Sequence, residues 1–138
     1  MSSLERLNPG EIAKRNVTTL DVSRIVLFLQ SLLGQEVTAY LSGVSQVKTV
    51  RLWASGKAKP RVLSKARLQV AYQAACLLTE AYDADTAKAW FFGCNTLLDG
   101  EAPAYVLRYG MTPDDFSLVV PAAYNLVELA ALALVEMG

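Results

Sequence analysis

The chain has 138 residues, 53% of them hydrophobic and none of them histidine, which fits one globular domain or two very small ones and excludes Ser-His-Asp or Cys-His nucleophiles and histidine metal ligands. Its 13 basic and 13 acidic side chains are segregated: residues 37–79 carry seven basic and no acidic residues, and residues 80–138 carry two basic and nine acidic ones. A basic middle beside an acidic end predicts two surfaces with different partners.

Apolar spacing interrupted by glycine and proline predicts short helices and no strand, which is an all-α fold. Residues 1–18 are expected to form a mobile N-terminal arm. Thr18 or Thr19 is predicted to cap the first helix and Ser45 the third, because hydroxyl oxygens accept hydrogen bonds from the free N–H groups at a helix start. The predicted helices of this half cover residues 21–33, 35–42, 46–55 and about 64–82.

The second half is divided by the same signals. Asp83 or Asp85 is expected to cap the next helix, Asn95 to cap a single turn, and Pro103 to occupy a first helical position. Pro121 should kink or split the last helix. The predicted elements are a helix that ends near residue 91, a turn that ends at residue 100, a helix over 103–109 and a helix from 113 to about 137.

Residues 35–56 have the pattern of a helix-turn-helix, because two short helices flank a tight turn at Gly43. The apolar residues expected to pack these helices together are Ala39, Leu41, Val44, Val50 and Trp53. The polar side chains predicted to face DNA are Gln46, Lys48, Thr49 and Arg51. Phosphate contacts are expected from the basic residues that follow, Lys57, Lys59, Arg61, Lys65 and Arg67. Gln and Arg are suited to adenine and guanine edges in the major groove.

Residues 49–60 resemble the end of the recognition helix in Xre-type repressors, where Trp, a two-residue spacer, Gly and a basic loop lead to Pro. The matching residues are Trp53, Gly56 and Pro60. One difference lies in the turn, since Gly43 and Val50 are seven positions apart where the Xre pattern usually has six. The extra residue, within the stretch Val44 to Lys48, would re-aim the third helix.

A more extended match begins at residue 90. Seven residues reproduce the spacing W-x4-N-x2-L-x-G-x2-P-x3-L-x2-G: Trp90, Asn95, Leu98, Gly100, Pro103, Leu107 and Gly110. This pattern resembles the toxin-binding domain of the Xre/MbcA/ParS antitoxin family, with Cys94 where that family commonly has Pro. The helix-turn-helix and the long helix precede the motif in the same order in that family.

Antitoxins of this kind bind a RES-domain toxin, an enzyme that consumes NAD, and cover its active-site entrance with their C-terminal region. Their DNA-binding half represses the shared operon. The resemblance therefore implies a non-enzymatic type II antitoxin with no metal or cofactor. Its expected partners are a RES-domain toxin and operator DNA, in a homodimer or a larger complex with the toxin.

The motif residues also have structural roles that need no partner. Trp90 would anchor the core, Asn95 would cap a turn, and Gly100 and Gly110 would adopt left-handed conformations. The toxin contact is therefore predicted on the apolar tail, residues 126–138. The candidate contact residues are Glu128, Leu129, Leu132, Leu134, Val135, Glu136, Met137 and Gly138. Burial in the chain's own core or in a homodimer is the competing explanation for this tail.

Cysteine usage and hydropathy favour a cytoplasmic protein. Cys76 and Cys94 stand 18 residues apart, without the CxxC spacing of zinc and redox sites, so two buried free thiols are expected. The longest uncharged run near the end, residues 116–127, contains a proline and stops at Glu128, so no membrane-spanning segment is expected. No signal-peptide pattern precedes the apolar segment 25–33.

The expected organisation is an arm over 1–18, a DNA-binding half over 19–62, a connecting helix over 63–82 and a toxin-binding half over 83–138. The alternative function is a stand-alone Xre-type regulator whose C-terminal helices only form a dimer. An enzyme would need carboxylate pairs such as Asp83 with Asp85 or Asp114 with Asp115. Those residues lie at predicted helix starts, where carboxylates favour the helix dipole, so catalysis is not expected.

Overall fold

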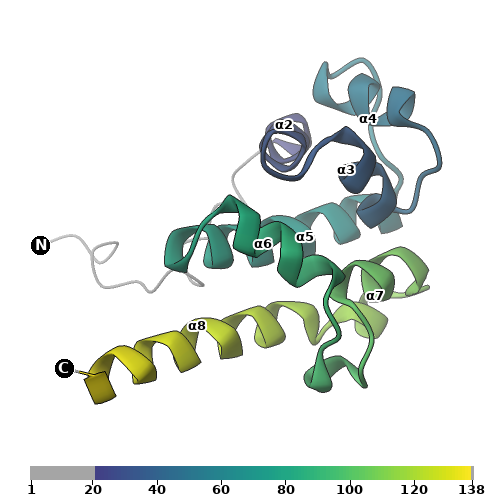
Figure 1. The fold of residues 1–138 in the computed structure, drawn as a ribbon. Helices are drawn as coiled ribbons and strands as arrows, with labels where there is room; N and C mark the ends of the chain where they lie inside the picture. Colours follow the sequence, from purple (N-terminus) through teal and green to yellow (C-terminus); the bar gives the residue numbers. More distant parts are fainter. Residues whose placement is uncertain (1–20, 138) are drawn as a thin grey trace, which may run out of the picture.

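The computed structural model describes residues 21–137, and over that range the all-α prediction is confirmed, because it contains seven α-helices, two short 3₁₀ turns and no strand (Figure 1). The elements are α2 (Val22–Leu33), α3 (Gln35–Ser42), α4 (Val47–Ala54), α5 (Val62–Ala81), α6 (Ala84–Phe92), η2 (Thr96–Leu98), α7 (Pro103–Tyr109), η3 (Pro113–Phe116) and α8 (Val119–Met137).

Helix α5 runs through the middle of the fold. Its small and aliphatic residues Leu68, Ala71, Ala75 and Leu78 are all buried, which is the stripe that helical spacing produces. Helices α2 and α3 contact α5 on one side and α8 packs along it on the other (Figure 1). The buried side chains form one continuous core that extends from α2 to the first turns of α8.

Two of the predicted helix caps are confirmed. Asp83 Oδ1 accepts the N–H of Thr86 at 2.7 Å, and Asn95 Oδ1 accepts the N–H of Leu97 at 2.9 Å. Ser45 is not a cap, because α4 begins after Gln46, whose side chain makes no capping bond. Thr18 and Thr19 lie outside the described residues.

The loop before η3 is held by one carboxylate. Asp115 Oδ2 accepts the N–H groups of Met111 and Thr112 at 2.8 and 3.0 Å, and these bonds lower the pKa of Asp115 below its usual range. A second carboxylate, Asp83, has its pKa lowered by its bonds to Thr86. Both side chains therefore act as structural acceptors at turns.

The prediction that one helix runs from residue 113 to about 137 and is kinked or split at Pro121 is wrong, because the break lies before Val119. Residues Pro113–Phe116 form a separate 3₁₀ turn, and α8 begins only at Val119. Pro121 consequently lies in the first turn of α8, where a missing N–H leaves no intrahelical hydrogen bond unmade. The proline is therefore compatible with a regular helix.

Gly110 does not have the predicted left-handed conformation. Its φ is −63°, whereas Gly100 has φ +82° as expected. Glycine is needed at position 110 for space, because a Cβ there would lie 2.9 Å from both Phe116 Cδ1 and Val106 O. These contacts are tighter than ordinary van der Waals packing.

The substitution Gly110→Ala should therefore lower the free energy of unfolding by about 1–3 kcal/mol, as overpacking does. Gly93→Ala is the matched control, since a Cβ at that position meets nothing closer than Ala89 O at 3.6 Å. Chemical denaturation of both variants measures the difference. Equal stabilities would show that the corner between Gly110 and Phe116 relaxes freely.

Candidate functional site

The stretch that the sequence predicts as a helix-turn-helix folds as α3, a turn and α4. Gly43 ends α3 in the left-handed conformation with φ +86°, and the N–H of Val44 bonds Ala39 O at 3.1 Å. The predicted internal residues Ala39, Leu41, Val50 and Trp53 are buried and Val44 is half-buried. Among residues 21–137, α4 packs mainly against α2 and α3, and we call its other side the outer face.

The side chains predicted to read DNA lie on that outer face. Gln46, Lys48 and Arg51 are exposed, and Thr49 is half-buried. Arg51 Nε donates to Gln35 Oε1 at 3.3 Å, which brings the first residue of α3 beside α4. The face therefore presents two cations and amide groups, the side-chain chemistry that base edges and phosphates accept.

The basic stretch after α4 divides into exposed and buried residues. Lys57, Lys59, Arg61 and Lys65 are exposed, and their contact with phosphate stays a prediction. Arg67 does not belong with them, because it is only 8% exposed and donates to the main-chain oxygens of Ser42 at 3.3 Å and Gly110 at 2.8 Å. The prediction that Arg67 contacts phosphate is wrong.

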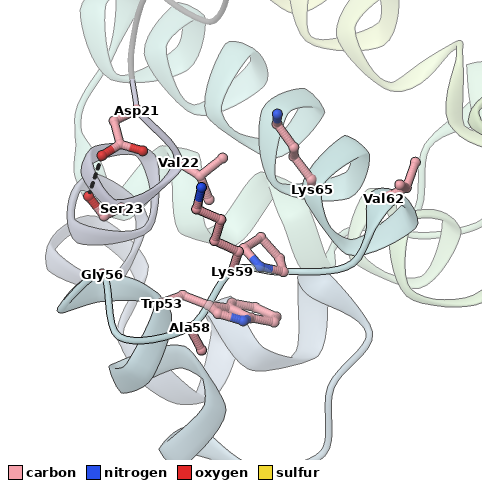
Figure 2. A pocket seen from close by; sticks show the side chains of 10 residues that line it. Asp21, Val22, Ser23, Trp53, Gly56, Ala58, Lys59, Val62 and Lys65 are labelled. Atoms are coloured by element: carbon pink, nitrogen blue, oxygen red, sulfur yellow. Dashed lines mark hydrogen bonds between the residues drawn. The ribbon is translucent and has the colours of Figure 1, made fainter.

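A hollow of about 380 Å³ lies between the start of α2, the loop after α4 and the start of α5 (Figure 2). Lys59 and Lys65 line it together with Trp53, and Ser23 Oγ donates to Asp21 Oδ2 at 3.1 Å on the α2 side. The two lysines line the same hollow although six positions separate them in the sequence. Basic groups from the loop and from α5 thus belong to one surface.

The seven motif residues of the acidic half act mainly in the fold. Leu98, Pro103 and Leu107 are buried. Trp90 is only half-buried, and the neighbouring Phe91 is the fully buried aromatic anchor, with the two rings edge to face at 5.2 Å. The expectation that Trp90 anchors the core is therefore corrected to Phe91.

A shallow groove of about 270 Å³ runs between η2 and α8. Its lining includes Trp90 and Asn95 of the motif on one side and Leu126 and Leu129 of α8 on the other. Leu97 adds an exposed side chain to the same groove. The motif thus borders α8 where the helix leaves the core.

The tail of α8 is apolar and uncovered. Leu129 and Leu132 are 54% and 60% exposed, and Leu134 and Val135 are 71% and 75% exposed. The earlier turns of the helix pack on the core, and Tyr82 Oη donates to Leu126 O at 3.2 Å. The side chains of Glu136 and Met137, and the whole of Gly138, lie outside the described part of the structure. Burial of the tail in the chain's own core is therefore wrong for residues 129–135.

The expectation that no segment could span a membrane is wrong by length and composition. Residues Pro113–Val135 form a stretch of 23 residues, and an 18-residue window within it has a mean hydropathy of 1.9. The stretch contains three acidic side chains, Asp114 and Asp115 near its start and Glu128 within α8. The same stretch supplies the buried core residues Phe116, Val119 and Ala123. A spanning helix would therefore have to leave the core it helps to form.

The two cysteines differ in their surroundings. Cys76 is half-buried, and burial raises the pKa of its thiol. Cys94 is exposed, so the expectation of two buried thiols is wrong for it. Among residues 21–137, no group of three or more His, Cys, Asp or Glu side chains could hold a metal ion.

Sequence reasoning missed Arg108, which contacts the end of α3 and the turn after it although it belongs to the acidic half. Its Nη1 donates to Tyr40 O and Val44 O, and its Cζ lies 4.7 Å from the centre of the Tyr40 ring. The sequence held one signal that could have identified Arg108. It and Lys88 are the two basic residues after position 79, in a segment with nine acidic residues.

The sequence matches no protein-family model, and no curated protein or solved structure is significantly similar to it.

Proposed function

We propose that the chain is the antitoxin of a type II toxin–antitoxin system. In this proposal the outer face of α4 binds operator DNA. The tail of α8 binds a RES-domain enzyme that consumes NAD, and the tail covers the active site of that enzyme. The motif between Trp90 and Gly110 and the two separate surfaces of the fold support the proposal. Helix α4 packs with α2 and α3, whereas α8 lies on the other side of α5, so both partners can bind at once (Figure 1).

The exposed leucines of the tail are the observation that carries this proposal. Leu129, Leu132 and Leu134 are each more than half exposed, while the aliphatic side chains of the helix's first turns are buried or half-buried. A contiguous exposed apolar surface is typical of a protein-binding site. The tail is narrow enough to enter a cleft because it is a single helix.

The carboxylate pairs that an enzyme would need have structural roles at turns and helix starts. Asp83 and Asp115 accept backbone N–H groups at turns, and their neighbours Asp85 and Asp114 occupy the first turns of α6 and η3. These positions suit the helix dipole and support a non-enzymatic role.

Co-expression with the adjacent gene product tests the proposal. We expect a RES-domain enzyme encoded there to arrest growth alone, to be harmless with this chain, and to copurify with it. Copurification should survive a high-salt wash, because apolar contacts are not screened by salt. A neighbouring enzyme that neither binds nor is neutralised would contradict the proposal.

A stand-alone regulator is the second candidate, because a dimer could also cover the exposed tail. In that case the purified chain should be a dimer that becomes a monomer when residues 128–138 are removed, and no enzyme should copurify. Light scattering on both forms of the chain separates this function from the antitoxin.

The basic loop after α4, which contains Lys57 and Lys59, should determine how strongly DNA binding depends on salt. The double substitution Lys57→Ala/Lys59→Ala is expected to reduce the slope of log K against log salt by about 0.9 for each phosphate that is no longer neutralised. Both lysines are exposed and free to meet the backbone. Fluorescence anisotropy with DNA from the chain's own upstream region measures the slope, and Arg24→Ala on α2 is the control. An unchanged slope in the double variant would remove the loop from the interface.

A further inference from the structure

The C-terminal end of α3 is held by side chains from outside the helix-turn-helix. Ser42 O accepts a hydrogen bond from Arg67 Nη1 of α5 at 3.3 Å. Tyr40 O and Val44 O both accept from Arg108 Nη1 of α7, at 3.1 and 3.2 Å. These carbonyls lie at the negative end of the α3 dipole, where guanidinium groups are stabilising. Two arginines thus hold the point at which α3 passes into the turn.

The guanidinium of Arg67 lies between the end of α3 and the corner after α7. It also donates from Nη2 to Gly110 O at 2.8 Å, so one guanidinium joins the end of α3 to the corner after α7. A Cβ on Gly43 would collide with Arg67 Nη1. Burial and the charge of Arg108 lower the pKa of Arg67, although an arginine stays ionised at neutral pH. The guanidinium of Arg67 therefore occupies the space beside Gly43, and a side chain at position 43 would have to displace it.

Two aromatic rings also contact the guanidinium of Arg108. Its Cζ lies 4.7 Å from the centre of the Tyr40 ring and 5.9 Å from that of Tyr109. Within residues 21–137, the contacts of Arg67 and Arg108 are with main-chain oxygens and rings, and none is with a carboxylate. Their charges are thus directed at the end of α3.

We propose that Arg67 and Arg108 are positioning residues for DNA recognition, which fix the turn that leads into α4. Operator binding then depends on the acidic half of the chain, although the proposed function assigns DNA contact to the basic half. The inference rests on that proposed function. The inference adds that residues of α5 and α7 set the direction of α4, which follows a turn one residue longer than that of the Xre pattern.

Substitutions of Arg108 in the full chain test this inference, because the residue is half-buried and its stem can be kept. Arg108→Met should weaken operator binding about tenfold. The salt slope should not change, because the same phosphates stay neutralised. Arg108→Lys should restore affinity to within about threefold, since an ammonium can donate to the same carbonyls. Lys88→Met removes an exposed charge from the same half and should have no effect.

Amide hydrogen exchange supplies a readout that does not involve DNA. In Arg108→Met, exchange of the amides of residues 44–50 should be about tenfold faster, while that of the buried turns of α5 stays unchanged. Equal exchange and equal operator affinity in Arg108→Met and the wild type would overturn the inference. A salt slope that falls by about 0.9 would also overturn it, because Arg108 would then contact phosphate directly. Wild-type protein that binds no upstream DNA would instead refute the DNA-binding part of the proposed function.

Discussion

Removal of residues 128–138 should abolish inhibition of the RES-domain enzyme while the rest of the chain stays folded. The cut follows Val127, so the carbonyl oxygen of Leu126 still accepts the hydrogen bond from Tyr82 Oη, and Ala130 is the one half-buried residue of α8 that is lost. The removed part carries the exposed leucines that we assign to the toxin contact. We expect the inhibition constant to rise at least about a hundredfold, which corresponds to about 2.7 kcal/mol.

A point substitution separates the tail from a general loss of apolar surface. Leu132→Glu places a charge at a side chain that is 60% exposed, and Leu118→Glu does the same at one that is 56% exposed but lies before α8. Only the first should weaken inhibition, and operator binding should be unchanged in both. A truncated chain that still inhibits the enzyme would show that the tail is not the blocking element.

The second large effect is expected on the outer face of α4. Arg51→Ala and Lys48→Ala should each weaken operator binding. For an arginine that contacts a base edge, the expected loss of binding free energy is about 1–3 kcal/mol. Both side chains are exposed, and neither contributes to the core. The melting temperature should therefore stay within about 2 °C of the wild type.

Binding of operator DNA and of a scrambled duplex measures this effect for the two variants. Arg51→Ala should lower the ratio of specific to non-specific affinity, whereas a substitution that only removes a phosphate-binding charge lowers both affinities alike. Arg24→Ala is again the control. Wild-type affinity in both variants would remove α4 from the DNA interface.

Much of the fold could be predicted because its signals are local. Gly43, Asn95 and Pro103 determine a turn, a cap and a helix start through their own backbone preferences, and each is found where the sequence indicates. Helix boundaries are less predictable. Thr112 and Pro113 form a helix-start signal and so predict that the last helix begins at residue 113, yet that signal opens only one 3₁₀ turn.

The errors at the candidate site come from contacts between distant parts of the chain. Arg67 resembles its exposed neighbours in sequence, and its burial depends on Ser42 and Gly110, which are 25 and 43 positions away. Trp90 and Phe91 are adjacent aromatics on one helix, and the packing of the other helices decides which of them is buried. Composition alone could not show whether the tail was covered.

A titration of NAD consumption tests the central claim most directly. Purified RES-domain enzyme from the adjacent gene would be mixed with increasing amounts of the wild-type chain, and NAD loss would be followed over time. The proposed function predicts that consumption falls to background near a stoichiometric ratio, and that the chain without residues 128–138 has no effect. Undiminished NAD loss in an excess of folded wild-type chain would contradict it.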